Sequence, residues 1–210
     1  MSSELKGIFL NESLVKLIQR KLPEIFNIAE IECSRAGKVG MEVGSVRESI
    51  LISLLMYVFG ENNIKCDIPI TESEIDVILF DTPISIKTKT GQGFNGIKAV
   101  WTVDPRKVHE YIEHFKPHFD ILLAQLVWNQ SGGLYYIPVE AQLEVFNRIG
   151  VSRYLIPPKE GTNPRGVEYS SDALFLAIRD PRSKAIPILW KKPDITYSKY
   201  KRWLDMWKEN

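Results

Sequence analysis

Acidic residues and lysines alternate along two neighbouring segments of the chain, which a short turn separates and a glycine-rich loop follows. The stretch, residues 74–96, reads EIDVILFDTPISIKTKTGQGFNG. Residues two apart in a β-strand share a face, so Glu74 and Asp76 point the same way, as do Lys87 and Lys89. An acid that faces an ammonium group on a sheet suits two kinds of structure. One is a salt-bridged hairpin with a solvated face, and the other is a metal site that hydrolyses a phosphodiester.

The relative position of these groups depends on the turn between the two segments. A two-residue turn at residues 82–83 would pair Asp76 with Lys89 and leave Lys87 diagonal to Asp76, within reach of its carboxylate. The first segment is otherwise too apolar for a freely solvated edge. The second leads directly into GQGFNG, where glycine lets the backbone approach a ligand closely. We therefore expect Asp76 and Lys87 to share a functional site.

Another acid stands at the start of an apolar helix predicted for residues 45–60. Ser45 and Glu48 have the S-x-x-E spacing of a capping box, and Gly60 is typical of a helix end. Beyond Glu48 the segment is apolar on nearly all sides, which predicts a buried helix. Glu48 is explained locally as a capping residue, and a catalytic role for it rests on the resemblance described below.

Hydrophobic periodicity and end signals predict the other elements, which form an α/β domain with a central mixed sheet flanked by helices. Helices are predicted at 11–32 with a break at Pro23, from Pro105 with Asp104 as N-cap, at 140–149 and at 198–208. Strands are predicted at 64–70, 74–81, 84–90, 97–103, 120–129, 133–139 and 186–190. Residues 120–129 are apolar enough for a strand covered on both faces. Prolines predict short, irregular pieces after residue 150.

Composition allows one sizeable core and gives no global sign of a partner. The chain has 210 residues, of which 44% are hydrophobic and 25% charged, and its net charge is +1. These are the values of an ordinary globular protein, so DNA binding would have to come from local basic clusters. The two cysteines form no disulfide framework, and no leader or membrane-spanning run is evident. We therefore expect a cytoplasmic protein that does not associate with a membrane.

Glu48, Asp76 and the lysine of the sequence SIK, Lys87, resemble in kind and order the active-site residues of the PD-(D/E)xK nuclease superfamily. The core of that superfamily is a helix, a three-stranded meander, a helix and a strand, which is the order predicted above. The resemblance covers a catalytic core at about residues 40–130. We expect a single nuclease domain over 1–210, with a helical N-terminal region at 1–39 and an irregular C-terminal extension at 150–210. Together with the flanking composition, these three residues resemble in particular the ThaI family of type II restriction endonucleases.

This resemblance implies a metal-dependent nuclease. Mg²⁺ would be held by the Asp76 carboxylate, the backbone carbonyl of Ile86 and Glu48, and the catalytic residues would be Glu48, Asp76 and Lys87. Lys87 would orient the attacking water and stabilise negative charge at phosphorus. The implied reaction is hydrolysis of double-stranded DNA at a short CG-rich palindrome, CGCG in the ThaI family. A homodimer would cut both strands and leave 5′-phosphate ends.

Polar side chains near the hairpin are candidate DNA ligands, because backbone contacts set affinity and base contacts set sequence. The amides of Gln92 and Asn95 can bind adenine or phosphate. Met41 lies between two glycines in the loop before the Glu48 helix. It is either a lid residue packed on the core or a wedge inserted between base pairs. The candidate DNA-binding residues are Arg35, Lys38, Met41, Lys89, Gln92, Asn95 and Lys98.

Two positions depart from the superfamily pattern and keep other functions open. Ser85 stands where a second acid is usual, so either Glu48 supplies that charge or the site holds one metal ion. Ile75 stands where proline is usual, which changes the strand entry and no chemistry. One alternative function is a structure-selective repair or junction-resolving nuclease, which would favour a more basic surface. Another, favoured by Ser85, is a non-catalytic DNA-binding module of the same fold.

Overall fold

The structure, a computed structural model, describes residues 4–34, 42–69, 74–102, 104–159, 166–198 and 200–208. Within these ranges a six-stranded sheet has the order β1-β2-β3-β5-β6-β9. Its strands are β1 (Ile64–Lys65), β2 (Val77–Leu79), β3 (Thr82–Thr90), β5 (Asp120–Leu126), β6 (Ser131–Ile137) and β9 (Lys184–Leu189). Only β3 and β5 pair in parallel, and the other neighbours are antiparallel. The predicted mixed α/β fold is confirmed.

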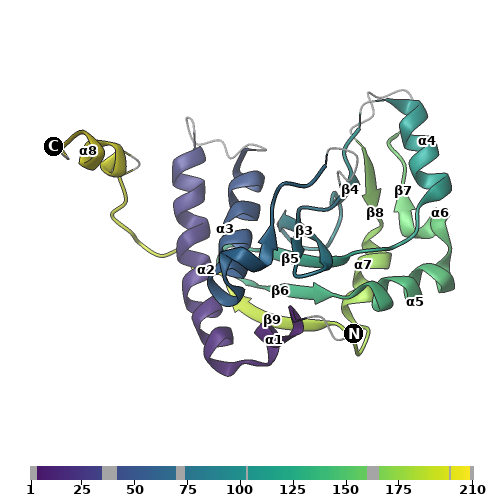
Figure 1. Ribbon diagram of the computed structural model, residues 1–210, viewed down its shortest axis with the longest axis horizontal. Helices are drawn as coiled ribbons and strands as arrows, with labels where there is room; N and C mark the ends of the chain where they lie inside the picture. The colour runs from purple at the N-terminus through teal and green to yellow at the C-terminus, as the bar shows by residue number, and fades with distance from the viewer. Residues whose placement is uncertain are drawn as a thin grey trace.

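Helices cover both faces of this sheet (Figure 1). One face carries α1 (Lys6–Leu10), α2 (Glu12–Cys33) and α3 (Glu42–Phe59), and a short 3-10 turn, η1 (Glu61–Asn63), leads from α3 to β1. The other carries α4 (Pro105–His114), α5 (Val139–Ile149), α6 (Val151–Tyr154) and α7 (Ser171–Ile178). On this second side lies a small sheet of order β4-β8-β7. Its strands are β4 (Lys98–Val100), β7 (Leu155–Ile156) and β8 (Val167–Tyr169).

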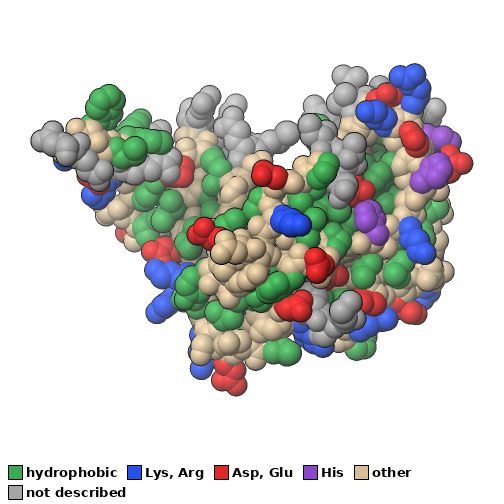
Figure 2. All heavy atoms as spheres, in the orientation of Figure 1, with side chains coloured by type: hydrophobic (Ala, Val, Ile, Leu, Met, Phe, Trp, Pro, Cys, Tyr) green, Lys and Arg blue, Asp and Glu red, His purple; other side chains and the backbone are tan. Residues whose placement is uncertain are grey.

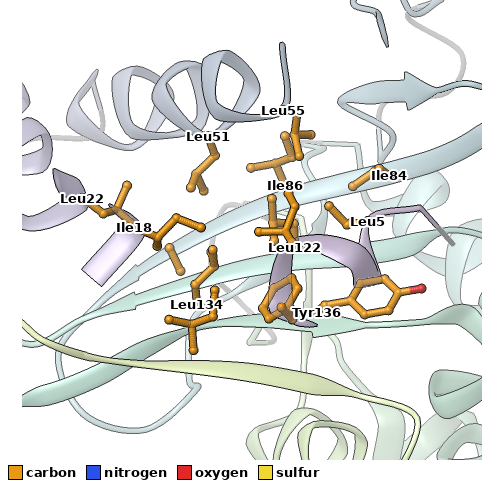
Figure 3. Packing of buried hydrophobic residues seen from close by; sticks show 14 of the residues in the cluster. Leu5, Ile18, Leu22, Leu51, Leu55, Ile84, Ile86, Leu122, Leu134 and Tyr136 are labelled. Atoms are coloured by element: carbon orange, nitrogen blue, oxygen red, sulfur yellow. The ribbon is translucent and has the colours of Figure 1, made fainter. Parts of the chain in front are cut away.

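Two hydrophobic cores lie on the two faces of the sheet because side chains alternate along each strand. On β5, Leu122 and Ala124 pack toward α1–α3, whereas Ile121 and Leu123 pack toward α4–α7. All seven residues of β5 are buried, which confirms the prediction of a strand covered on both faces. Figure 3 shows the first core, where side chains of α3 point at those of the sheet.

The β2–β3 hairpin has a different register from the predicted one. Val77 pairs with Ile84 and Leu79 with Thr82, so the chain turns at residues 80–81 and not at 82–83. Phe80 adopts a positive φ of 52° in this turn. Its N–H donates to the carbonyl oxygen of Asn63 at 2.8 Å, which ties the turn to the segment before β1. The shift is an even number of residues, so every side chain stays on its predicted face.

Three features of the helices also differ from the predictions. The structure has α3 begin at Glu42, so Ser45 lies inside the helix and the predicted capping box is wrong. The predicted break at Pro23 is wrong as well, because α2 runs through this buried proline. A proline removes one helical hydrogen bond, and packing of its ring in the core compensates for that loss. Finally, α3 is buried on one face only, since Leu51 lies in the core but Tyr57 is 71% exposed.

The C-terminal part contains more regular structure than its prolines predicted. Pro187 lies in β9, the edge strand of the large sheet, where a missing N–H leaves only the open side unpaired. After Trp190 the chain runs along α2 and ends in α8 (Lys201–Lys208), which confirms the predicted final helix. Figure 1 shows α8 standing apart from the rest of the molecule. Among the described residues, the structure contains no helix of sufficient length and hydrophobicity for a membrane span.

Candidate active site

Asp76 and Lys87 meet where the β2–β3 ladder ends. Asp76 precedes β2, and its N–H donates to the carbonyl oxygen of Ile84 at 3.0 Å. Its Oδ2 accepts a hydrogen bond of 2.6 Å from the N–H of Ile86 and lies 3.5 Å from Nζ of Lys87. The two side chains are 28% and 16% exposed, respectively, so the ion pair is partly shielded from water and still reachable by a ligand. The hairpin thus holds an acid and an ammonium group together at an open edge.

Ser85, at the position of the superfamily's second acid, lies beneath this pair and is completely buried. Its hydroxyl donates to the carbonyl oxygen of Glu74 at 2.5 Å, and Oγ is 3.4 Å from Oδ2 of Asp76. The hydroxyl therefore fastens the segment that carries Asp76 onto β3. A side chain in this position supports the carboxylate and does not face a ligand.

We expect Ser85→Ala to lower the free energy of unfolding by about 1–3 kcal/mol, because the substitution leaves the Glu74 carbonyl without its donor. Cleavage of DNA should fall by about tenfold, the effect of a residue that positions a ligand. Urea unfolding and initial cleavage rates measure the two effects, with exposed Ser131→Ala as the matched control. Unchanged stability would show that the hydroxyl contact does not hold the segment.

Glu48 approaches the same site from α3, which packs over β3. Burial raises the pKa of Glu48 to about 7, with the Lys87 ammonium opposing this shift and the Asp76 carboxylate adding to it. The three charged groups are therefore close enough to affect one another. Since Glu48 is not a capping residue, the structure leaves it without the local explanation that the sequence offered.

A buried ion pair fixes the beginning of α3. The guanidinium of Arg47, the residue before Glu48, bonds to the carboxylate of Glu30 on α2 and donates to Oγ1 of Thr90 on β3 at 2.8 Å. Glu30 also accepts from Nε1 of Trp128 at 2.7 Å. Sequence reasoning missed this network, although a single Arg in an apolar helix was a visible signal. Arg47 holds α3 against both α2 and β3, and thereby positions Glu48.

The donors at this site suit a hard divalent cation. Among the described residues no group of three or more His, Cys, Asp or Glu side chains could hold a metal ion. A backbone oxygen is available beside the two carboxylates. The N–H and C=O groups of one strand residue point to the same edge. Because the N–H of Ile86 points to Asp76, its carbonyl oxygen also faces this edge. Asp76, Glu48 and Ile86 thus offer two carboxylates and a carbonyl, ligands typical of Mg²⁺.

The glycine-rich loop after β3 is held from below by Gln125 of β5. The Gln125 amide donates to the carbonyl oxygens of Gly91 and Gly93, at 3.4 and 3.1 Å. Both glycines have positive φ, a conformation that other residues rarely adopt. Phe94 packs edge-on against Tyr135 and anchors the loop tip. Gln125 is a second residue that sequence reasoning missed, and its signal was one amide within an otherwise apolar strand.

The predicted DNA-binding residues fall into three groups. Lys89 is half-buried on β3, while Gln92 and Asn95 are exposed on the loop, where the Gln92 amide donates to Oε1 of Gln130 at 2.7 Å. Lys98 is engaged elsewhere, in an ion pair of 2.6 Å with Glu168 of β8. Arg35, Lys38 and Met41 lie outside the described residues. Of all the predicted site residues, the structure brings the catalytic and metal-binding candidates Glu48, Asp76, Ile86 and Lys87 together.

A mixed sheet with an Asp–Lys pair on its hairpin and an acid on the covering helix defines the class of protein, a nuclease of the PD-(D/E)xK kind. The model of the family "Restriction endonuclease ThaI" matches residues 8–209. A solved structure titled "Restriction endonuclease in complex with substrate DNA" is similar over 99% of this chain and 100% of its own, at 50% identity and a TM-score of 0.89. No curated protein matches.

The chain therefore belongs to the ThaI restriction endonuclease family. Membership makes it a site-specific deoxyribonuclease, and it confirms the family resemblance that Glu48, Asp76 and Lys87 indicated.

Proposed function

We propose that the chain is a type II restriction endonuclease that hydrolyses double-stranded DNA with Mg²⁺. The observation that carries this proposal is the contact of Asp76 with both the N–H of Ile86 and Nζ of Lys87. An ordinary surface salt bridge contains only two charged groups. Here a third, Glu48, is held beside the Asp76–Lys87 pair, and burial raises its pKa to about 7. Burying an acid in this way is unfavourable unless a cation compensates it.

Asp76, Glu48 and the carbonyl oxygen of Ile86 supply the metal ligands in this proposal. When bound there, Mg²⁺ lowers the pKa of a water molecule and neutralises charge on the scissile phosphate. Ser85 is buried and bonded to Glu74, so the chain provides protein ligands for one ion, and we propose a one-metal site. Two partly buried carboxylates and one carbonyl would hold the ion and leave it accessible to water and phosphate.

Lys87 acts on the phosphate and on the attacking water. Asp76 holds its ammonium at the open edge of β3, where it stabilises negative charge that develops on the phosphorus oxygens. The same group donates a hydrogen bond that orients the water for in-line attack. The bond to the 3′-oxygen breaks, so that the products carry a 5′-phosphate and a 3′-hydroxyl.

For DNA contacts we propose the residues around this edge. Lys89 would bind a backbone phosphate, and the exposed amides of Gln92 and Asn95 would bind bases or phosphate. Lys98 would first have to leave Glu168, which makes it the weakest of these candidates. Arg35, Lys38 and Met41 complete the proposed interface, with Met41 acting either as a lid residue or as a wedge between base pairs.

We further propose a homodimer, because the two strands of a palindrome need two symmetric active sites. The proposed target is a short CG-rich palindrome, CGCG, on the strength of family membership. The whole chain, residues 1–210, would act as one nuclease domain. Both cysteines are free, which fits the expected cytoplasmic location of an enzyme that acts on intracellular DNA.

Cleavage of matched duplexes tests this function. We expect a duplex with one CGCG site to be cut once in Mg²⁺, whereas a duplex of the same composition with GCGC in its place stays intact. EDTA should abolish cutting, because Asp76 and Glu48 have no catalytic use without a cation. Products should ligate without prior phosphorylation, which reports the 5′-phosphate.

Other outcomes separate the alternatives. Cutting of four-way junctions but not of either duplex would replace restriction by junction resolution. Retained binding to both duplexes, with no cutting in Mg²⁺ or Mn²⁺, would leave a non-catalytic DNA-binding module.

A further inference from the structure

The C-terminal helix α8 presents large apolar side chains to solvent. Leu204 and Met206 are more than half exposed, and Trp207 is 88% exposed. Figure 2 shows hydrophobic side chains of this helix standing out from the body at the upper left. A helix of eight residues is not stable in water by its own hydrogen bonds, so it needs a surface to pack against.

A second apolar surface, which no described residue covers, lies between α2 and α3. It is a groove of about 410 Å³, lined mainly by apolar side chains. Its apolar lining includes Leu17, Leu22, Ile25, Ile50, Leu54 and Tyr57. The sequence of α3 is apolar on nearly all sides, as in helices that are covered all round, yet the described part of the chain covers only one of its faces. The outer face of α3 therefore has the composition of an interface.

The charges at these two surfaces do not oppose an apolar contact. At the groove, Lys21 and Glu24 pair with each other at 3.0 Å. On α8, Lys201 and Asp205 pair at 2.9 Å, one turn apart. In each pair the two opposite charges neutralise each other, so the apolar faces can meet without burying an unpaired charge.

The segment that follows Trp190 and ends in α8 forms a C-terminal arm. It is attached to the C-terminal part of α2, away from the groove of the same copy. The carbonyl oxygen of Pro193 accepts from Nδ2 of Asn27 at 3.0 Å, and Tyr197 donates to Glu32 near the end of α2. At 1.5 Å per residue, the middle of the groove lies roughly 15 Å back along α2 from Glu32. From this attachment α8 leads away from the body (Figure 1).

We propose that α8 of each copy of this chain packs in the α2–α3 groove of a second copy, so that two copies exchange arms around a two-fold axis. The inference rests on the proposed homodimeric function and names the surface that forms the dimer. Every copy carries both the arm and the groove, which is what a closed, self-complementary interface requires.

The expected area is sufficient for a stable dimer. A buried aromatic side chain covers about 150–250 Å². Each copy contributes an arm with Trp207, Leu204 and Met206 and a groove with Tyr57. Two exchanged arms therefore approach the roughly 800 Å² per partner of a standard interface.

Sedimentation velocity of the full chain tests the exchange. The arm variant is Trp207→Ser and the groove variant is Tyr57→Asp, both at exposed positions where folding is not at risk. We expect wild type to be a dimer and each variant to have a dissociation constant raised by at least about 100-fold. The control, Phe175→Ser, changes another exposed aromatic residue, on α7, and should remain dimeric.

Mixing the two variants gives a sharper result. In a dimer of either variant alone, both arm–groove contacts contain the substitution. A mixed dimer can instead place the intact arm of Y57D in the intact groove of W207S. Because each contact needs both partners, we expect the mixture to dimerise more tightly than either variant. A monomeric wild type, variants that dimerise like the control, or a mixture no better than its parts would overturn the proposal.

The outcome for the proposed function is independent. A wild-type dimer that exchanges arms but cuts no DNA in Mg²⁺ would reject the nuclease and keep the interface. A chain that cuts CGCG while it remains a monomer would reject the interface and keep the nuclease.

Discussion

Lys87→Ala should lower the rate of DNA cleavage by at least about 10²–10³-fold while DNA binding persists. The ammonium of Lys87 lies 3.5 Å from Asp76 at the open edge of β3, where the proposed mechanism has charge develop on the phosphate. Loss of one such stabilising group in an active site typically costs about 3–4 kcal/mol of transition-state stabilisation. Single-turnover cleavage of the CGCG duplex measures the rate, and gel-shift titration in Ca²⁺ measures binding separately.

Lys89→Ala is the matched control, since it removes the same group two residues along the same face of the same strand. We expect its single-turnover rate to stay within about tenfold of wild type. Its binding should weaken, with a salt dependence reduced by the loss of one phosphate contact. If Lys89→Ala abolished cleavage and Lys87→Ala retained it, the assignment of Lys87 as the catalytic lysine would be wrong and the proposed site would be rejected.

Glu48→Gln should raise the stability of the metal-free protein above pH 7 and at the same time abolish most cleavage. The folded protein binds a proton at Glu48 with a pKa of about 7, against 4.5 for the ordinary side chain, mainly because of burial. The folded state therefore holds the proton more tightly than the unfolded state. Stability falls as pH rises from about 4.5 to about 7 and stays at the lower level above that range.

Glutamine does not titrate, so the variant lacks this loss of stability. At pH 8 we expect a gain of about 1–3 kcal/mol, less than the full shift would give because Glu48 is only partly buried. Urea unfolding at pH 5 and pH 8 measures this gain, with Glu61→Gln, at an exposed acid of η1, as control. Mg²⁺ should raise the melting temperature of wild type more than that of Glu48→Gln, as expected when a ligand binds only the folded state. A variant with the wild-type pH profile would contradict the burial of this acid.

The sequence predicted the elements that depend on local pattern. The apolar run of β5, the Asp104 cap before α4 and the stop at Gly60 follow from residues next to one another, and each lies where it was expected. The contact between Asp76 and Lys87 was also predicted, although through the wrong register. It survived because the pleat repeats every two residues, and an even shift conserves which side chains share a face.

Long-range packing decided what the sequence did not show. The turn at Phe80 is set by its bond to Asn63, a residue outside the hairpin. Pro23 stays inside a continuous helix because its ring is buried in tertiary structure, which single-residue propensity does not include. The Arg47–Glu30 pair joins α3 to α2, and the hydrophobic periodicity of neither helix predicts which residues will pair.

Of the proposed reacting groups, Glu48 lies on α3, Lys87 lies on β3 and Asp76 is hydrogen-bonded to β3, while the exposed amides Gln92 and Asn95 lie on a loop. Arg47 is bonded to Glu30 and Thr90 in the interior, so the neighbouring Glu48 is held as firmly as the core itself. The side-chain amide of Gln125 holds the loop by hydrogen bonds to backbone carbonyl oxygens of Gly91 and Gly93. These bonds do not depend on which side chains the loop presents to solvent. Changes in those side chains can accumulate during evolution without disturbing hydrolysis. A lineage with this architecture can therefore acquire new target sequences while the cutting machinery is inherited unaltered.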